Sequence, residues 1–561
     1  MGVKGRIIVA YLASVLFYGV FVSFFTSTVH AGVDEDIYLA LAKSFHYSGC
    51  FEIEGQAASY SCVLYSMLIS VAYYFYSPEN ILLFMRLIGV AVMCSAIFPI
   101  WLLAKGLLGD SQRAFRISCL SLCFPYMFDC AYLMQEVLSY PLFLWVLYFF
   151  YCSYRFWDNK KGNSYMMLCA VFSVLCLFTK TYMFFIPVAI NVLLVFDKLI
   201  AGQKWKKVLG KAASYDGAYL LTGAALYFAI RSLNGFQQGS DHYGTQFMSL
   251  FPMNANTFLG GVLGICFYVS FLFLNMGVLP PLSLFACYKK MTGHSQKMAR
   301  FCILSLIFLV LEIVILIVLT EERGELLPHK FLFRYFHIFV PIVTILFAKR
   351  HWRVDFLENR KVGIAAGIFL LFAFCYFLVM KGGTRQAIMD GHFFLLLENI
   401  TKYILPFADA VIVLILGVLF GVIVWAAWNG KRERPGRIVG MGIAAVAAMA
   451  IINCFQLPVY SNNIASGKII QKDAVRMAEY LNGENYDFIY YVNGGNYYLR
   501  NFYGYLRQPY RAVPKEKLEE EIQKGGRGKT VVIAPKEVLN EIDGLKAVEI
   551  ETEKYTLYTI S

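Results

Sequence analysis

Acidic side chains occur in two places next to long apolar segments. Asp34, Glu35 and Asp36 follow the first apolar segment, and Glu136 follows the third. Three adjacent carboxylates repel one another, so at least one should have a raised pKa unless cations lie nearby. Such a group could take a proton from an acceptor. The alternative is a solvated acidic flank that only orients the first helix.

Three isolated cations lie close to the same ends of other apolar segments. Lys180 sits in the short connection Thr179-Lys180-Thr181, Arg86 lies just inside a second segment, and Arg334, followed by Tyr335, opens a later one. Each cation alone could simply extend its charge to lipid headgroups. All three fall at the membrane depth of the carboxylates, which favours a site that grips a lipid phosphate.

The composition requires that these residues be positioned by membrane-spanning helices. Of the 561 residues, 59% are hydrophobic and 16% are charged, and runs of about 20 apolar residues recur along the chain. The net charge of +13 comes from basic residues between these runs, so it does not imply nucleic acid. Most of the fourteen cysteines lie inside apolar runs, but Cys50 and Cys62 share a polar loop and could form a disulfide.

The segment Tyr60–Tyr76 decides the topology, because every later helix inverts if it crosses the membrane. If it lies in the interface, 26 basic residues fall on the N-terminal side and only ten elsewhere in the membrane part. The positive-inside rule then predicts a cytoplasmic N-terminus. The first apolar segment is accordingly expected to be an uncleaved signal anchor. The prediction is thirteen spans, beginning near 7, 81, 115, 137, 164, 182, 213, 262, 301, 334, 362, 404 and 438.

Two domains are predicted, an all-α polytopic membrane domain over residues 1–456 and a small α/β domain over 457–561. The outer loop 27–80 of the first carries the interfacial segment. By parity the second domain is outside the cell or in a lumen. Its predicted elements are two helices, two strands and a terminal hairpin, over Lys468–Leu481, Glu516–Gln523, Asp487–Val492, Thr530–Ala534 and Ala547–Ile560.

The acidic run resembles a known signature. Asp34-Glu35-Asp36-Ile37-Tyr38-Leu39-Ala40-Leu41-Ala42-Lys43 is similar to the DE-x-x-Y-x-x-x-A-[RK] pattern in the first outer loop of GT-C membrane glycosyltransferases. The nearest are those using polyprenyl-phosphate sugars, namely protein O-mannosyltransferases and the aminoarabinose transferase of lipid A. Met134-Gln135-Glu136 resembles the second acidic position of that family, Phe178-Thr179-Lys180 its T-K-G turn, and Phe333-Arg334-Tyr335 with Pro341 its RY-then-Pro element.

This resemblance covers the order of elements over about the first 350 residues, with two departures. Thr181 replaces the glycine of the T-K-G turn, and Ala57-Ala58-Ser59 replaces a proline-rich start of the interfacial segment. These departures concern how the donor phosphate is bound and which donor is used.

The resemblance implies transfer of a sugar from a polyprenyl-phosphate donor to an extracytoplasmic glycolipid, cell-surface glycan or protein, with inversion, in a bacterial plasma membrane. Asp34 aligns with the family's general base, and Glu35 and Glu136 would orient acceptor or sugar. Arg86, Lys180, Arg334 and Tyr335 would bind the donor phosphate. No metal-ligand spacing is present, although some GT-C enzymes hold a divalent ion with acidic residues, a role open to Asp34 with Glu136.

Two other functions fit parts of the pattern. A transporter or flippase of lipid-linked sugars would explain the carboxylates Glu312 and Asp409 within apolar segments, because intramembrane carboxylates are usually functional. The absence of repeated halves in the sequence argues against a carrier. A surface-polymer ligase or polymerase would use the same class of substrate, but it lacks the DExxY loop.

Overall fold

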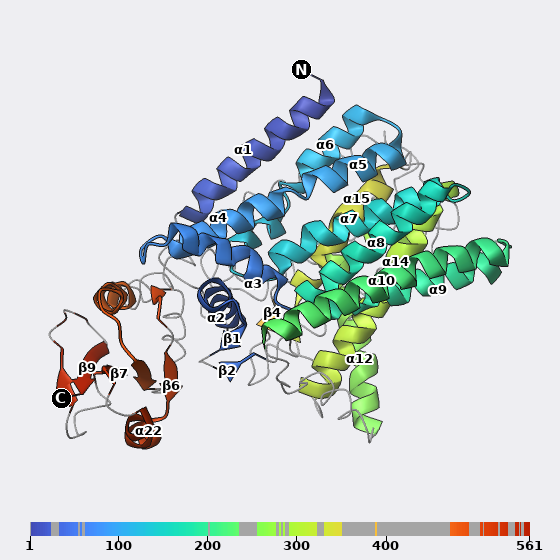
Figure 1. Cartoon of the computed structure of the whole chain (residues 1–561). Coiled ribbons are helices and arrows are strands. Elements are labelled where there is room, and N and C mark those ends of the chain that lie inside the picture. Colours follow the sequence, from blue (N-terminus) through green and yellow to red (C-terminus); the bar gives the residue numbers. More distant parts are fainter. Residues whose placement is uncertain are drawn as a thin grey trace, which may run out of the picture.

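A bundle of long helices makes up most of the molecule, and a small sheet lies near the C-terminus (Figure 1). The computed structural model describes residues 2–23, 33–53, 56–58, 62–199, 202–234, 255–276, 280–281, 284–285, 291–321, 330–349, 388–389, 472–492, 505–508, 510–525, 528–536, 545–548, 550, 552 and 555–560. The predicted spans near 362, 404 and 438, and with them Asp409, lie outside these residues.

Within the described residues, six helical stretches are long and apolar enough to cross a membrane. They are Val3–Ser23, Ile81–Leu108, Glu136–Arg155, Lys160–Thr179, Ala255–Phe273 and Gly293–Leu319. They coincide with the spans predicted near 7, 81, 137, 164, 262 and 301. In the order of the chain they belong to α1 (Val3–Ser23), α4 (Ile81–Cys94) with α5 (Ile97–Leu108), α7 (Glu136–Arg155), α8 (Lys160–Thr179), α12 (Ala255–Asn275), and α14 (Gly293–Ile313) with the π-helical η5 (Val314–Glu321).

Four further predicted spans coincide with helices of other lengths. These helices are α6 (Ser111–Ser121), α9 (Phe185–Leu199), α10 (Trp205–Leu233) and α15 (Val340–Lys349). Short 3-10 turns precede or follow three of them: η2 (Pro125–Ala131), η3 (Thr181–Phe184), and η6 (Phe333–Tyr335) with η7 (His337–Phe339). β3 (Lys330–Phe331) lies just before η6 and pairs in parallel with β4 (Ile388–Met389).

Local chemistry explains where several helices begin and end. α2 (Val33–Ser48) carries three acidic residues in its first turn, where negative charge interacts favourably with the positive end of the helix dipole. α5 ends at Gly109, whose φ of 74° is left-handed and suits a residue without a Cβ. The side chain of Asp110 then caps α6 by accepting from the N–H groups of Gln112 and Arg113.

The helices of the first outer loop are too short to cross the membrane. α3 (Leu64–Ile69) and η1 (Ser70–Phe75) contain six residues each. At a rise of about 1.5–2.0 Å per residue they are shorter than the bilayer core of about 30 Å. The interfacial assignment of Tyr60–Tyr76 agrees with this. The same loop holds a short hairpin, β1 (Glu52–Ile53) with β2 (Gln56–Ala57).

The suggested disulfide in this loop is wrong. Cys50 and Cys62 are not joined by a disulfide, and the Sγ atom of Cys62 donates to the carbonyl oxygen of Leu177 at 3.4 Å. Cys62 thus contributes a polar contact between the loop and α8 rather than a covalent bridge within the loop.

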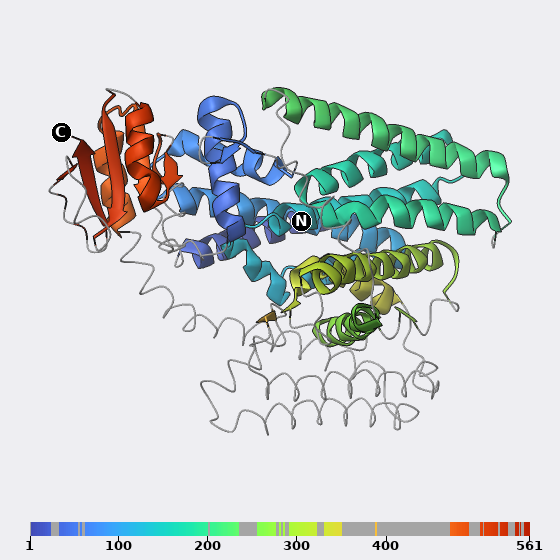
Figure 2. The same cartoon turned by 90° about the horizontal axis from the view of Figure 1, so that it is seen from below.

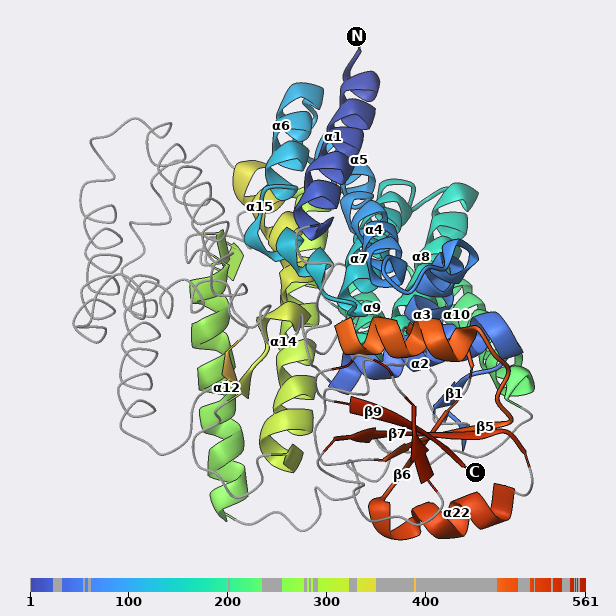
Figure 3. The same cartoon turned by 90° about the vertical axis from the view of Figure 1, so that its left-hand side faces the viewer.

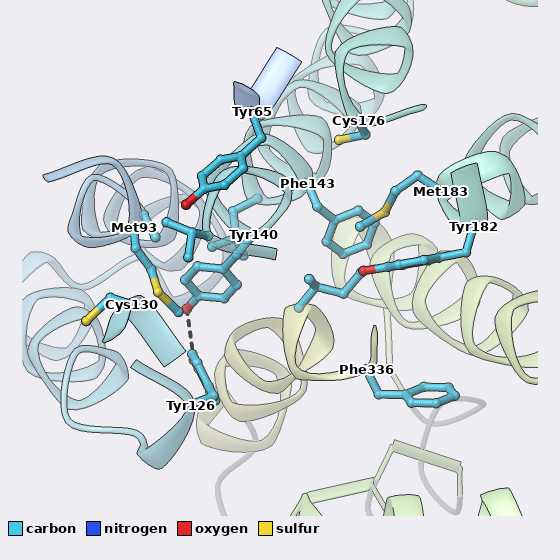
Figure 4. Packing of buried hydrophobic residues seen from close by; sticks show 14 of the residues in the cluster. Tyr65, Met93, Tyr126, Cys130, Tyr140, Phe143, Cys176, Tyr182, Met183 and Phe336 are labelled. Carbon is cyan, nitrogen blue, oxygen red and sulfur yellow. Dashed lines mark hydrogen bonds between the residues drawn. The ribbon is translucent and has the colours of Figure 1, made fainter. Parts of the chain in front are cut away.

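The centre of the bundle is packed with aromatic side chains. α7 lies against α8, and α8 lies against α10, so the three run side by side (Figure 2). Tyr126 and Tyr140 are both fully buried and share a hydrogen bond of 2.8 Å, next to Phe143 (Figure 4). Buried hydroxyls need such partners, since an unsatisfied one destabilises the fold.

The C-terminal part is a five-stranded mixed sheet in the order β6-β5-β7-β9-β8. Its strands are β5 (Phe488–Val492), β6 (Arg511–Val513), β7 (Thr530–Pro535), β8 (Leu545–Ala547) and β9 (Tyr555–Ile560), preceded by a helix over 472–482 and interrupted by η10 (Lys515–Lys517) and α22 (Leu518–Gly525). The helix 472–482 and α22 cover opposite faces (Figure 3). The predicted helices, strands and terminal hairpin are confirmed, while β6 was not predicted.

The N-terminus and the C-terminal sheet lie at opposite ends of the bundle (Figure 3). α2, α3 and the C-terminal ends of α1 and α8 are at the end that meets the sheet. The predicted parity requires this separation. Which side of the membrane each end occupies remains a prediction, as does the boundary at 456/457.

Candidate active site

One buried carboxylate and two cations form an ion cluster at the end of the bundle nearest the sheet. Glu136, the first residue of α7, is 2% exposed. Its Oε1 atom lies 3.3 Å from Nζ of Lys180 and 3.6 Å from Nε of Arg334. We refer to Glu136, Lys180 and Arg334 as the ion cluster. Three predicted site residues from distant parts of the sequence are therefore in mutual contact.

Aromatic rings complete the surroundings of the Lys180 ammonium. Nζ of Lys180 lies 6.0 Å from the centre of the Tyr38 ring and 5.7 Å from that of Tyr335, within the range of cation–π attraction. The Tyr38 hydroxyl accepts from Nζ at 3.4 Å. Burial alone would lower the pKa of Lys180, but the Glu136 carboxylate raises it above its ordinary value, so the ammonium stays charged.

A second pair, Glu35 and Arg86, holds the loop that leads into Glu136. Both side chains are buried, with exposures of 2% and 1%. Oε1 of Glu35 accepts from the N–H of Leu133 at 2.8 Å, and Nε of Arg86 donates to the carbonyl oxygen of Ala131 at 2.8 Å. Hydrogen bonds with Glu35 and Arg86 thus hold residues 131–133 in place.

The next residue in this loop is anchored as well. Nε2 of Gln135 donates to the carbonyl oxygen of Cys62 at 2.7 Å. Glu136 follows immediately, so its position depends on these three anchors. Glu35 and Arg86 therefore reach the ion cluster through the backbone of the loop 131–135, which the sequence alone did not suggest.

Burial raises the pKa of Glu35 to about 8, and the opposing attraction of Arg86 and the Leu133 N–H only partly offsets the effect. A raised pKa within the acidic run was expected from mutual repulsion of the carboxylates. The structure shows that loss of solvation is the larger cause, because Asp34 and Asp36 contribute less.

Asp34 is the least buried of the three adjacent acids. It lies in the first turn of α2 and is partly exposed, whereas Glu35 and Asp36 are buried. Tyr38 follows it by four residues and so lies on the same face of the helix. Because Tyr38 contacts Lys180, this face of α2 is turned toward the ion cluster.

Three tyrosines of this site were not predicted as site residues. Tyr38 is the tyrosine of the DE-x-x-Y pattern, which was the available signal. Tyr65 lies within electrostatic range of Glu35, Arg86 and Glu136. The Tyr182 ring lies against the Tyr335 ring at a tilt, with ring centres 4.5 Å apart. Figure 4 shows Tyr65 and Tyr182 approaching the packed centre from opposite sides.

Among the described residues, no group of three or more His, Cys, Asp or Glu side chains is arranged to hold a metal ion. Glu312, which motivated the carrier alternative, lies on α14 and is partly buried. It belongs to neither the ion cluster nor the Glu35–Arg86 pair.

No protein-family model matches the sequence, and no curated protein matches it. Solved structures do match. The crystal structure of ArnT from Cupriavidus metallidurans bound to undecaprenyl phosphate superposes with a TM-score of 0.55 at 13% identity, over 98% of this chain and 97% of that one. The apo structure of the same protein gives 0.54 at 14% identity, over 100% and 98%.

Proposed function

Because this chain has the GT-C fold of those structures, we propose that it is an integral membrane glycosyltransferase. It transfers a sugar from a polyprenyl-phosphate donor to an extracytoplasmic acceptor. The observation that carries the proposal is the ion cluster, which places two cations and one carboxylate at the predicted outer end of a membrane bundle. The likeness to a protein solved with undecaprenyl phosphate supports the class of donor.

The charge balance of the ion cluster favours an anionic ligand. Glu136 carries one negative charge, and Lys180 and Arg334 carry two positive charges around a single oxygen atom of it. Among these three side chains positive charge exceeds negative charge by one, and a lipid phosphate would neutralise this excess. Arg334 is the more accessible cation, with 30% of its side chain exposed against 11% for Lys180. It is the cation we propose to meet the phosphate first.

Arg86 has a different part in this proposal. Its side chain is 1% exposed and donates to Ala131, so it positions the loop before Glu136 rather than meeting a lipid. Tyr335 frames Lys180 and keeps its ammonium next to the carboxylate.

Asp34 is proposed as the general base. It is the accessible carboxylate on the face of α2 that bears Tyr38, and it would take the proton of the attacking acceptor hydroxyl. The oxygen attacks the anomeric carbon while the bond from that carbon to the phosphate breaks, which inverts its configuration. The departing phosphate is a stable anion, so it needs positive charge rather than a general acid.

The test uses the purified full-length protein in lipid nanodiscs with radiolabelled undecaprenyl-phosphate sugars. Asp34→Asn should reduce transfer by about 10²–10⁴-fold and leave binding of undecaprenyl phosphate unchanged. Arg334→Ala should weaken that binding by about tenfold or more. Lys207→Ala is the matched control, because that lysine forms an exposed ion pair with Asp158 at the opposite end of the bundle.

Two outcomes contradict the proposal. Undiminished transfer by Asp34→Asn would show that Asp34 is not the general base. Movement of labelled lipid-linked sugar between leaflets without its consumption would identify a carrier instead.

A further inference from the structure

Lys43, the last residue of the DE-x-x-Y run on α2, takes part in a contact that the ion cluster does not include. Its side chain is 6% exposed, and its Nζ atom donates to the carbonyl oxygen of Gln508 at 2.7 Å. The same Nζ atom lies 5.4 Å from the centre of the Tyr510 ring. Gln508 and Tyr510 lie just before β6, so Lys43 joins α2 to the C-terminal sheet.

The acceptor of this hydrogen bond is itself held at several points. Nε2 of Gln508 donates to the carbonyl oxygens of Leu481, at 2.8 Å, and of Glu484. Its Oε1 atom accepts from the N–H of Tyr486 at 3.0 Å. These bonds tie Gln508 to the end of the preceding helix and to the turn before β5. The bond from Lys43 therefore attaches α2 to a well-anchored point of the C-terminal part.

A second contact joins the same two parts of the chain. The hydroxyl of Tyr76, just after η1, donates to the carbonyl oxygen of Tyr505 and accepts from Nδ2 of Asn482 at 2.7 Å. Asn482 is the last residue of the helix 472–482. The first outer loop thus reaches the C-terminal part through directional hydrogen bonds from both α2 and the end of η1.

Apolar packing continues across the same boundary. One face of the sheet and the helix 472–482 share the main hydrophobic core with the bundle, through Ile489, Tyr491, Val531, Ile533, Ala474, Met477, Ala478 and Leu481. The alternate strand residues Tyr490 and Val532 belong to a separate core with Leu518 of α22. The C-terminal sheet is therefore docked on the bundle through one of its two sides.

α2 lies between this docked side and the ion cluster. Its Tyr38 hydroxyl accepts from Nζ of Lys180 in the ion cluster at 3.4 Å. Lys43 follows Asp34 by nine residues, which at about 3.6 residues per turn is about two and a half turns, so the two project from opposite faces of the helix. The face of Asp34 and Tyr38 is turned toward the ion cluster, and Lys43 on the other side contacts the C-terminal part.

We propose that Lys43 is a positioning residue for the active site. Through its bond to Gln508, the docked C-terminal sheet supports α2 from behind and keeps Asp34 and Tyr38 in place beside the ion cluster. The inference rests on the proposed glycosyltransferase function for its kinetic consequences.

The first experiment measures sugar transfer by full-length Lys43→Met in lipid nanodiscs. Methionine keeps an unbranched apolar side chain but cannot donate to Gln508, so α2 loses this support. The kcat should fall by about tenfold or more, because small displacements of a reacting group are costly. Binding of undecaprenyl phosphate should stay unchanged, since Lys180 and Arg334 lie on other elements.

Two further variants separate positioning from a general effect of losing a buried lysine. Lys211 is 2% exposed, and its Nζ atom lies 5.4 Å from the centre of the Trp157 ring at the opposite end of the bundle. Lys211→Met should keep the kcat of the wild-type protein. Lys43→Arg retains a donor and should retain most of the kcat. Equal losses in the two methionine variants, or a loss in Lys43→Arg as large as in Lys43→Met, would overturn the proposal.

A third measurement does not depend on the enzyme assignment. Amide hydrogen exchange over residues 33–48 should be faster in Lys43→Met than in the wild-type protein, and unchanged in Lys211→Met. If Lys43→Met does not fold, Tyr76→Phe carries the test, because it loosens the same docking by the loss of a single hydroxyl. Tyr490→Phe is its control, since that hydroxyl donates to the carbonyl oxygen of Glu521 at 3.0 Å, on the side away from the bundle.

Exchange over residues 33–48 that is as slow in Lys43→Met and Tyr76→Phe as in the wild-type protein overturns the inference. If exchange accelerates but the wild-type protein transfers no sugar, the proposed function fails while the structural support of α2 holds.

Discussion

At the scale of residues, the site contains more charge than a membrane protein normally buries. Glu136 is tolerated because two cations share one of its oxygen atoms and aromatic rings frame Lys180. Removing one partner of such a group would leave an uncompensated charge, which is usually strongly destabilising. The ion cluster is therefore expected to act as a unit.

The first prediction concerns Glu35 and pH. Its pKa is about 8 in the folded protein against 4.5 ordinarily, so the folded state binds the proton more tightly. The free energy of unfolding should accordingly fall as the pH rises from about 4.5 to about 8, where the unfolded carboxyl has lost its proton and the folded one must lose it at a cost. Glu35→Gln should flatten this dependence, measured as the melting temperature of the purified protein at a series of pH values.

Glu484→Gln provides the control for this prediction. Glu484 is exposed and pairs with Lys529, which lowers the pKa of its carboxyl, so it does not titrate in that window. Its replacement should keep the slope of the wild-type protein. A slope that persists in Glu35→Gln would mean that another group carries the pH dependence.

At the scale of elements, the turn between α7 and α8 is closely packed. Gly162 lies in the first turn of α8, and a Cβ there would overlap the carbonyl oxygen of Phe156 and the Lys211 ammonium. Neither the backbone oxygen nor the buried lysine can move away easily. The glycine thus lets α8 start directly beside the end of α7.

The second prediction uses this contact. Gly162→Ala should lower the free energy of unfolding by about 1–3 kcal/mol through overpacking. Gly217→Ala on α10 is the counterpart, because no atom of the described residues lies within 4 Å of a Cβ at that position. It should raise stability by about 0.5–1 kcal/mol, since glycine is unfavourable inside a helix. Thermal unfolding in one detergent would compare the two, and equal shifts would contradict the packing argument.

At the scale of the whole molecule, the separation of the N-terminus from the C-terminal sheet can be tested for orientation. The distribution of basic residues predicts a cytoplasmic N-terminus and a sheet outside the cytoplasm. A phosphatase that is active only outside the cytoplasm should therefore be active when fused after Ser561. The same enzyme fused after Lys161, in the first turn of α8, should be inactive. The reverse result would invert the topology and place the ion cluster on the cytoplasmic side.

The sequence by itself determined the class of the fold and most of its elements. Lipid requires helices of about 20 apolar residues with their hydrogen bonds closed internally, so composition alone reveals them. The alternation of apolar residues likewise predicted β5, β7 and the terminal hairpin. The DExxY run pointed to α2 as part of a site, and Glu136, Lys180 and Arg334 were expected near one another at a common depth.

Only the tertiary structure decided which of these charges meet. Arg86 donates to Ala131 and Glu35 accepts from Leu133, because the rotation of α4 and the path of residues 131–135 bring these groups together. Tyr65 carries no sequence signal for a site, since its place near the acidic groups arises from the packing of distant segments. Depth along a helix follows from counting residues, but the direction of each side chain depends on neighbours that only the folded chain supplies.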